Sequence, residues 1–243
     1  MRFLALLLAG LVLTLPAMAA GGGAYEAANT QVGNPAALQR GAALYMNYCA
    51  GCHSLKYMRW SRLATDLGLT EDQVMENLVF SDAKFGDTIG VAIPPADGAA
   101  WFGKAPPDLS LVARSRGVDW IYTYLKSFYV DPTAAVGWNN TVFPNASMPN
   151  VLWELQGVQE ARFGESHGDG SGPVVEKLEL VRPGLLDPGQ FKGSIRDLTT
   201  FLQYVGEPAV LKRQALGVWV LLYLALFTLI AWLLKREYWK DVH

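Results

Sequence analysis

Two long apolar runs stand near the two ends of the 243-residue chain, and segments of mixed polarity lie between them. The first run, residues 3–16, follows Arg2 and closes on Ala17-Met18-Ala19, with small residues at the first and third positions. A run of this length is too short to span a bilayer, and its flanks are typical of a bacterial secretory signal peptide. We therefore expect residues 1–19 to be cleaved during export.

The second run, residues 215–234, contains no charged side chain. Roughly 20 apolar residues cross the hydrocarbon core of a membrane, and basic residues flank this run on both sides, as in membrane helices. The pattern predicts an anchor helix over residues 211–236. Because the signal peptide exports the preceding chain, we expect residues 20–210 on the periplasmic side of a bacterial inner membrane. Residues 237–243 then form a short cytoplasmic tail.

Helical periodicity predicts four helices in the exported domain. Their expected ranges are residues 35–48, 70–79, 119–130 and 194–206. Asn34 before Pro35 is a typical helix start, and capping-box patterns begin the second and the fourth helix. Gly41 is unfavourable inside a helix, so we expect the first helix to cross the last one closely at this residue.

Three further segments lack helical periodicity. Residues 81–104 form a loop rich in glycine and proline, and loops of this length usually have a function. Residues 151–159 and 174–181 have strand-like content with glycine-rich material between them, which predicts a small β-hairpin. The expected fold class is therefore mainly α, with long loops, a small hairpin and one C-terminal transmembrane helix.

The sequence Cys49-Ala50-Gly51-Cys52-His53 contains both cysteines of the chain. This spacing is typical of covalent haem attachment, with each thiol adding to a vinyl group and the histidine binding the iron. The thiols are about one helical turn apart, so they share one edge of the ring. A redox dithiol or half of a zinc site has the same spacing. No second cysteine pair completes a zinc site, and the pattern favours one covalent haem c.

The second iron ligand is sought among the remaining methionines and histidines. Met46 and Met58 are too close to the haem motif to reach the other face of the ring, and Met75 lies on an apolar helical stripe. Met148, in an irregular loop before a proline, is preferred; His167, in a polar loop, is the alternative. A thioether ligand raises the reduction potential. It also closes the iron to small ligands, which favours outer-sphere electron transfer over substrate chemistry.

Charged side chains weakly indicate a contact with a haem propionate and a basic protein partner. Arg114 and Arg116 are candidate partners for a haem propionate, although either one also fits a solvated surface. Residues 21–210 hold 20 acidic and 14 basic side chains. This acidic balance steers a basic protein partner and repels nucleic acid, or simply keeps the domain soluble.

The order of these features resembles the cytochrome c1 family of the ubiquinol:cytochrome c oxidoreductase (bc1) complex. The most specific motifs are Arg40-Gly41, Cys49 to Ser54, Pro106 to Ser110, Arg114 with Arg116, and Phe143-Pro144 through Met148-Pro149. The resemblance implies thioether bonds at Cys49 and Cys52, and axial iron ligands at His53 and Met148. It also implies haem contacts at Arg116 and Pro107. Trp101-Phe102-Gly103 and Trp120 depart from residues that are common in the family.

The resemblance further implies a haem domain like class I cytochromes c, which does no substrate chemistry on its own chain. Electrons would arrive from the Rieske iron–sulfur protein and leave to a cytochrome c. Cytochrome b would hold the anchor helix, within a dimeric complex. Two alternatives stay open. One is an anchored c-type carrier or terminal-oxidase subunit outside the bc1 complex. The other is a haem gas sensor or peroxidase, which needs an open iron position and, for signalling, an output domain.

Overall fold

The computed structural model describes residues 25–164 and 175–241. The expected signal peptide and the candidate ligand His167 lie outside these ranges. The helices and strands follow one another in this order: α2 (Pro35–Tyr48), β1 (Leu55–Arg59), α3 (Trp60–Leu67), α4 (Glu71–Asn77), β2 (Thr88–Ile89), α5 (Pro95–Phe102), α6 (Val112–Ser115), α7 (Val118–Lys126), β3 (Phe128–Val130), β4 (Trp138–Asn140), α8 (Trp153–Gln156), β5 (Gly157–Phe163), β6 (Val175–Pro183), α9 (Pro188–Gly206) and α10 (Val210–Tyr238). About half of the described residues are helical, and the predicted mainly α class is confirmed at this level.

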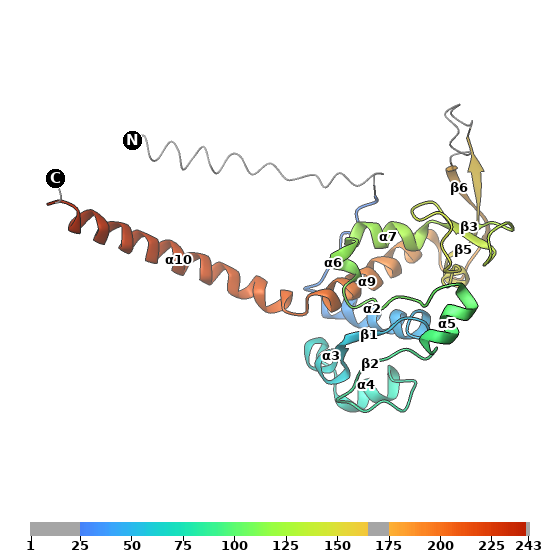
Figure 1. Cartoon of the computed structure of the whole chain (residues 1–243), viewed down its shortest axis with the longest axis horizontal. Coiled ribbons are helices and arrows are strands. Elements are labelled where there is room, and N and C mark those ends of the chain that lie inside the picture. The colour runs from blue at the N-terminus through green and yellow to red at the C-terminus, as the bar shows by residue number, and fades with distance from the viewer. Residues whose placement is uncertain (1–24, 165–174, 242–243) are drawn as a thin grey trace.

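Helices α2 and α9 form the centre of the head domain and pack against each other (Figure 1). A Cβ atom on Gly41 would lie 2.2 Å from the carbonyl oxygen of Asp197 and 2.7 Å from Cβ of Phe201, so only glycine permits this approach. Arg40 binds the Asp197 carboxylate beside the crossing, at 2.6 Å. The predicted close crossing at Gly41 is confirmed.

Aromatic side chains from both helices meet where α2 and α9 pack together. Tyr45 and Phe201 are fully buried with ring centroids 5.7 Å apart, and Tyr204 continues the cluster along α9. Helix α7 packs on the same helix α9 through its buried face, which includes Ile121 and Leu125. The core therefore lies directly beneath the C-terminal end of α2, where the cysteine motif begins.

Three two-stranded antiparallel sheets surround this core: β1–β2, β3–β4 and β5–β6. The predicted hairpin is β5–β6, but its first strand begins at Gly157 and not at residue 151. Residues 153–156 instead form the single turn α8. Gly157 has a φ of +93°, which ends that turn and begins the strand.

Two predicted helix boundaries are wrong. The last helix begins at Pro188, because Asp187 and Gln190 form the capping box there. The capping box predicted at residue 194 does not form, and Asp197, which would complete it three residues later, binds Arg40 instead. Helix α7 ends at Lys126, because residues 128–130 pair with β4.

Two predicted helix starts agree with the structure, and the predicted long loop does not. Asn34 caps α2 and Thr70 forms a capping box with Gln73, both as predicted. The segment over residues 81–104 is not a continuous loop, since it contains β2 and α5. Short helix α6 follows the Pro106–Ser110 segment.

Helix α10 leaves the head as one long, isolated helix (Figure 1). Residues Ala215–Tyr238 are long and apolar enough to cross a membrane, and their most apolar stretch is not buried against the head. Lys235 and Arg236 lie in its last turn. These features fit a single C-terminal membrane anchor.

Candidate functional site

The cysteine motif continues the end of α2 as a series of tight turns. The amide of Cys49 donates to the Tyr45 carbonyl at 2.8 Å, and the amide of His53 donates to the Cys49 carbonyl at 2.9 Å. The buried hydroxyl of Tyr45 donates to the carbonyl of His53 at 2.6 Å. Backbone and core hydrogen bonds therefore fix the positions from which both thiols and the imidazole project.

His53 is oriented by a hydrogen bond to the segment that follows α5. Its Nδ1 lies 2.7 Å from the carbonyl oxygen of Pro107. Because a carbonyl can only accept, Nδ1 carries the proton and Nε2 keeps a free lone pair. Burial lowers the pKa of His53, against opposing effects of the Pro107 carbonyl and Asp108. A neutral imidazole with one nitrogen free is the form that binds a metal.

Asp108 holds the Pro107 segment against the cysteine motif. One carboxylate oxygen accepts from the Ser54 hydroxyl at 2.8 Å and from the Lys56 amide at 2.9 Å, and the other accepts from the Ser110 amide at 3.0 Å. Burial raises the pKa of Asp108, but these hydrogen bonds outweigh it and the pKa is lowered. The charged carboxylate thus keeps the Pro107 carbonyl beside His53.

Two adjoining cavities open beside the motif, with volumes of about 120 and 380 Å³. Both are lined by Cys49, His53, Pro107 and Met148. Cys52 lines the smaller cavity, and the rest of the walls is mostly apolar. The larger cavity has the size of a pocket for an organic cofactor, and both have the apolar character of one.

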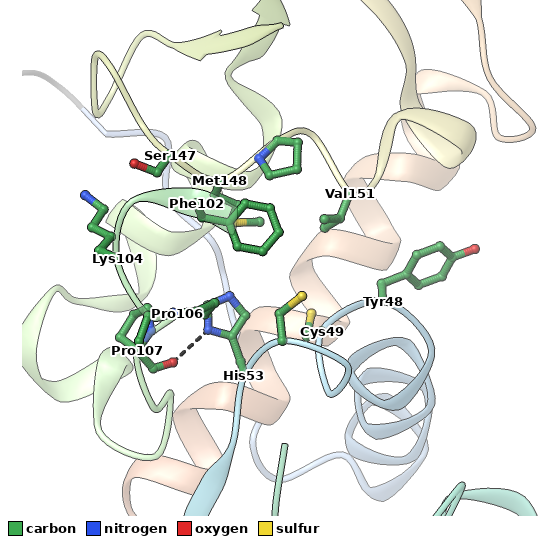
Figure 2. A pocket seen from close by; sticks show the side chains of 13 residues that line it. Tyr48, Cys49, His53, Phe102, Lys104, Pro106, Pro107, Ser147, Met148 and Val151 are labelled. Atoms are coloured by element: carbon green, nitrogen blue, oxygen red, sulfur yellow. Dashed lines mark hydrogen bonds between the residues drawn. The ribbon is translucent and has the colours of Figure 1, made fainter. Parts of the chain in front are cut away.

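Met148 lies on the side of the cavity opposite His53. Figure 2 shows the imidazole and the thioether reaching into the space between them from opposite walls, with Cys49 at one edge. Two thiols at an edge, a nitrogen donor on one face and a sulfur donor on the other are the set that holds a covalent haem. The residues of this cavity fit that group.

Three buried asparagines hold the loop that carries Met148. Asn140 accepts from the amides of Val142 and Phe143 at 2.8 and 3.1 Å. Asn139 accepts from the Asn145 amide at 2.8 Å. Beyond Met148, Asn150 accepts from the Leu152 amide at 3.0 Å. These side chains satisfy backbone groups that no regular element pairs.

Tyr124 contacts Met148 directly. Its hydroxyl donates to the sulfur with an oxygen–sulfur distance of 3.6 Å, and burial raises the pKa of Tyr124 to about 12. Neither Tyr124 nor the asparagines were predicted from the sequence. An asparagine pair next to an irregular segment that precedes a methionine was the available signal for the loop.

Of the two candidate arginines, Arg116 lines the larger cavity. Its guanidinium lies over the Trp120 ring, 5.2 Å from the centroid. The side chain of Arg114 instead passes Gly206 of α9. The structure therefore brings Arg116 and Pro107 to the cavity, together with Phe102 and Lys104 from the predicted long segment.

The electrostatics of Cys49 argue against a redox dithiol. Burial, with a smaller effect of Cys52, raises the pKa of Cys49 to about 12. A reactive dithiol needs a lowered pKa, since the thiolate is the nucleophile.

The fold and the site together define a c-type cytochrome. The Cytochrome C1 family model matches residues 29–161 and 188–242, which leaves out all of β6 and the end of β5. Cytochrome c1 of Allochromatium vinosum is 51% identical over 98% of this chain and 99% of its own. Mitochondrial cytochrome c1 of Saccharomyces cerevisiae is 28% identical over 85% of this chain and 67% of its own.

A third relative has a different name. The ammonia monooxygenase gamma subunit of Nitrosomonas europaea is 39% identical over 85% of this chain and 83% of its own.

The family match covers well over half of the chain. The chain therefore belongs to the cytochrome c1 family, whose members bind one covalent haem c and carry electrons.

Proposed function

We propose that this chain is the membrane-anchored monohaem subunit that passes electrons from the Rieske iron–sulfur protein to a cytochrome c within the bc1 complex. Cys49 and Cys52 would form the thioether bonds to the haem, and His53 and Met148 would bind its iron. The observation that carries the proposal is the pair of donors, His53 and Met148, on opposite walls of one apolar cavity. The bound haem supplies a one-electron redox couple.

The protein's own residues then bind, orient and exclude water. Pro107 keeps the Nε2 atom of His53 unprotonated and available, and Met148 occupies the opposite position. With His53 and Met148 both holding the iron, small ligands would have no access to it, so the chain would move electrons and make no bonds to a substrate. Arg116, on the wall of the larger cavity, is placed to bind a propionate.

We further infer the placement of the chain in the membrane. Residues 1–19 are a cleaved signal, residues 20–210 form a periplasmic domain of the class I cytochrome c kind, residues 211–236 are the anchor and residues 237–243 are cytoplasmic. The basic last turn of α10 supports this orientation. Cytochrome b packs against α10, and a relative in Bradyrhizobium diazoefficiens that is named cytochrome b/c1 supports cytochrome b as a partner. The acidic head attracts a basic cytochrome c.

One observation favours a second candidate outside the bc1 complex. The Nitrosomonas europaea relative carries the name of a monooxygenase subunit. An anchored electron carrier that serves another membrane enzyme has the same cavity and the same anchor.

Purification from the native membrane in mild detergent separates these candidates. If the chain belongs to a bc1 complex, haem b copurifies with haem c, quinol reduces both, and a quinol-site inhibitor blocks the reduction of haem c. Haem c without haem b, or with an oxidase haem or a monooxygenase, would contradict the assignment.

A further inference from the structure

The sulfur of Met148 has a hydrogen-bond donor of its own. Tyr124, 24 residues earlier and on α7, points its hydroxyl at this sulfur with an oxygen–sulfur distance of 3.6 Å. A thioether sulfur is a weak acceptor. Among the described residues, Met148 is the one hydrogen-bond partner found for this hydroxyl.

The ring of Tyr124 is fixed from both sides. It stacks on Trp120, with centroids 4.8 Å apart and planes 9° apart, and meets the edge of Phe128 at 5.0 Å. Arg116 covers the outer side of Trp120. Arg116, Trp120 and Tyr124 line the larger cavity, and the aromatic contacts of the Tyr124 ring leave its hydroxyl little freedom.

A second contact ties Tyr124 to the Met148 loop. Its backbone carbonyl accepts a hydrogen bond from the side-chain amide of the buried Asn140, at 2.8 Å. Asn140 also accepts from two amides of that loop. The position of the hydroxyl relative to Met148 is therefore set by the same side chain that shapes the loop.

We propose that Tyr124 is a positioning residue that aims one lone pair of the Met148 sulfur at the haem iron and raises the reduction potential by binding the other. This inference rests on the proposed role of Met148 as an iron ligand. The hydrogen bond draws electron density away from the sulfur, so the sulfur donates less to ferric iron. Ferric iron needs that donation more than ferrous iron does, and the reduced state is favoured.

A purely structural role for Tyr124 predicts a different outcome. The ring alone fills space between Trp120 and Phe128, and replacing Tyr124 with phenylalanine keeps both contacts. Tyr122 provides a matched control, because it is buried on the same helix and its hydroxyl points at the carbonyl of Lys192, 3.5 Å away. If Tyr124 had only a structural role, Tyr124→Phe and Tyr122→Phe would have the same reduction potential.

The test is a potentiometric titration of the full-length holoprotein in detergent, as wild type, Tyr124→Phe and Tyr122→Phe. We expect Tyr124→Phe to lower the equilibrium constant for reduction about fivefold, which is about 40 mV for a one-electron couple. Tyr122→Phe should leave the potential unchanged. Equal potentials for the two variants would overturn the proposal.

Two further measurements separate this proposal from the one it rests on. The thioether-to-iron charge-transfer band of the oxidised wild type should be present, and it should disappear in Met148→Ala; if it is absent from the wild type, the ligand assignment fails. In the wild-type holoprotein, NMR should show the Tyr124 ring protons next to the Met148 methyl group. A missing contact, with the band present, would overturn the role of Tyr124 without any variant.

Discussion

The two walls of the haem cavity are built in different ways. On the His53 wall, five consecutive residues carry both thiols and the imidazole, and hydrogen bonds within the turns from Tyr45 to His53 fix them. On the Met148 wall, the donor lies in an irregular loop whose backbone is held by Asn139, Asn140 and Asn150. One wall is a five-residue motif, and the other is an irregular loop held by its own asparagines and by Tyr124 of α7.

Because of this difference, the His53 wall governs how firmly the haem is attached, and the Met148 wall governs the properties of the iron. The His53 wall rests on the core through the close crossing of α2 and α9, so it is rigid and has a recognisable sequence motif. The Met148 wall depends on a few buried polar contacts, and losing one of them leaves a buried group without a partner. We therefore expect substitutions on the two walls to have different consequences for the haem, and the predictions below test this.

The largest effect is expected at the helix crossing beneath the His53 wall. Gly41→Ala places a methyl group 2.2 Å from the Asp197 carbonyl, so α2 and α9 must separate. We expect the free energy of unfolding of the holoprotein, measured by denaturant titration, to fall by about 3 kcal/mol.

Gly193→Ala is the matched control for this substitution. It lies in α9, and an added Cβ meets no atom within 4 Å. This change should be neutral or stabilising by about 0.5–1 kcal/mol. Equal stabilities of the two variants would show that the crossing is not close in solution.

A smaller loss of stability with a direct effect on the iron is expected on the Met148 wall. Asn140→Ala removes acceptors from the amides of Val142 and Phe143 and a donor from the Tyr124 carbonyl. We expect a loss of about 2 kcal/mol from the unpaired buried groups. The thioether-to-iron band should weaken as well, while the covalent haem stays attached.

The exposed Asn47, whose side chain bonds only within α2, is the control for Asn140. Asn47→Ala should change stability by less than about 0.5 kcal/mol. An Asn140→Ala variant with an unchanged band would mean that Met148 is held by other contacts.

The smallest effect is expected at Asp108, which supports the His53 wall from outside. Asp108→Asn should cost about 1 kcal/mol, because the site is partly exposed and solvent screens the charge. The folded pKa of Asp108 is lowered, so its contribution is full above the unfolded pKa and is lost as pH falls through the folded pKa. The stability difference between wild type and variant should therefore be constant above about pH 5 and shrink below about pH 4.

Asp82→Asn, on the exposed surface, serves as the control for Asp108. It should give no comparable difference at neutral pH. A difference between wild type and Asp108→Asn that grows as the pH is lowered would contradict the assigned role of the carboxylate.

The same contrast explains which features of the fold and the site could be predicted from the sequence. The helix start at Asn34, the crossing at Gly41 and the haem motif depend on neighbouring residues or on one steric requirement, and periodicity and spacing reveal them. In the sequence, elimination of the other candidates points to Met148, because no periodic or capping pattern marks the loop that carries it.

The errors have a physical cause as well. The start of α9 was misplaced because Asp197, which fits a capping pattern, is used by Arg40 from another helix. The contact between Tyr124 and Met148 could not be predicted, because it depends on the packing of α7 against a loop without regular structure. Side chains that satisfy distant backbone groups carry no periodic signal.

The central claim, a haem iron closed by His53 and Met148, is tested most directly by carbon monoxide binding to the reduced holoprotein. We predict that the wild type and the control Met75→Ala, on α4 away from the cavity, bind no carbon monoxide. We predict that Met148→Ala keeps its covalent haem and binds the gas readily. Binding by the wild type, or a Met148→Ala variant that stays closed, would contradict the account.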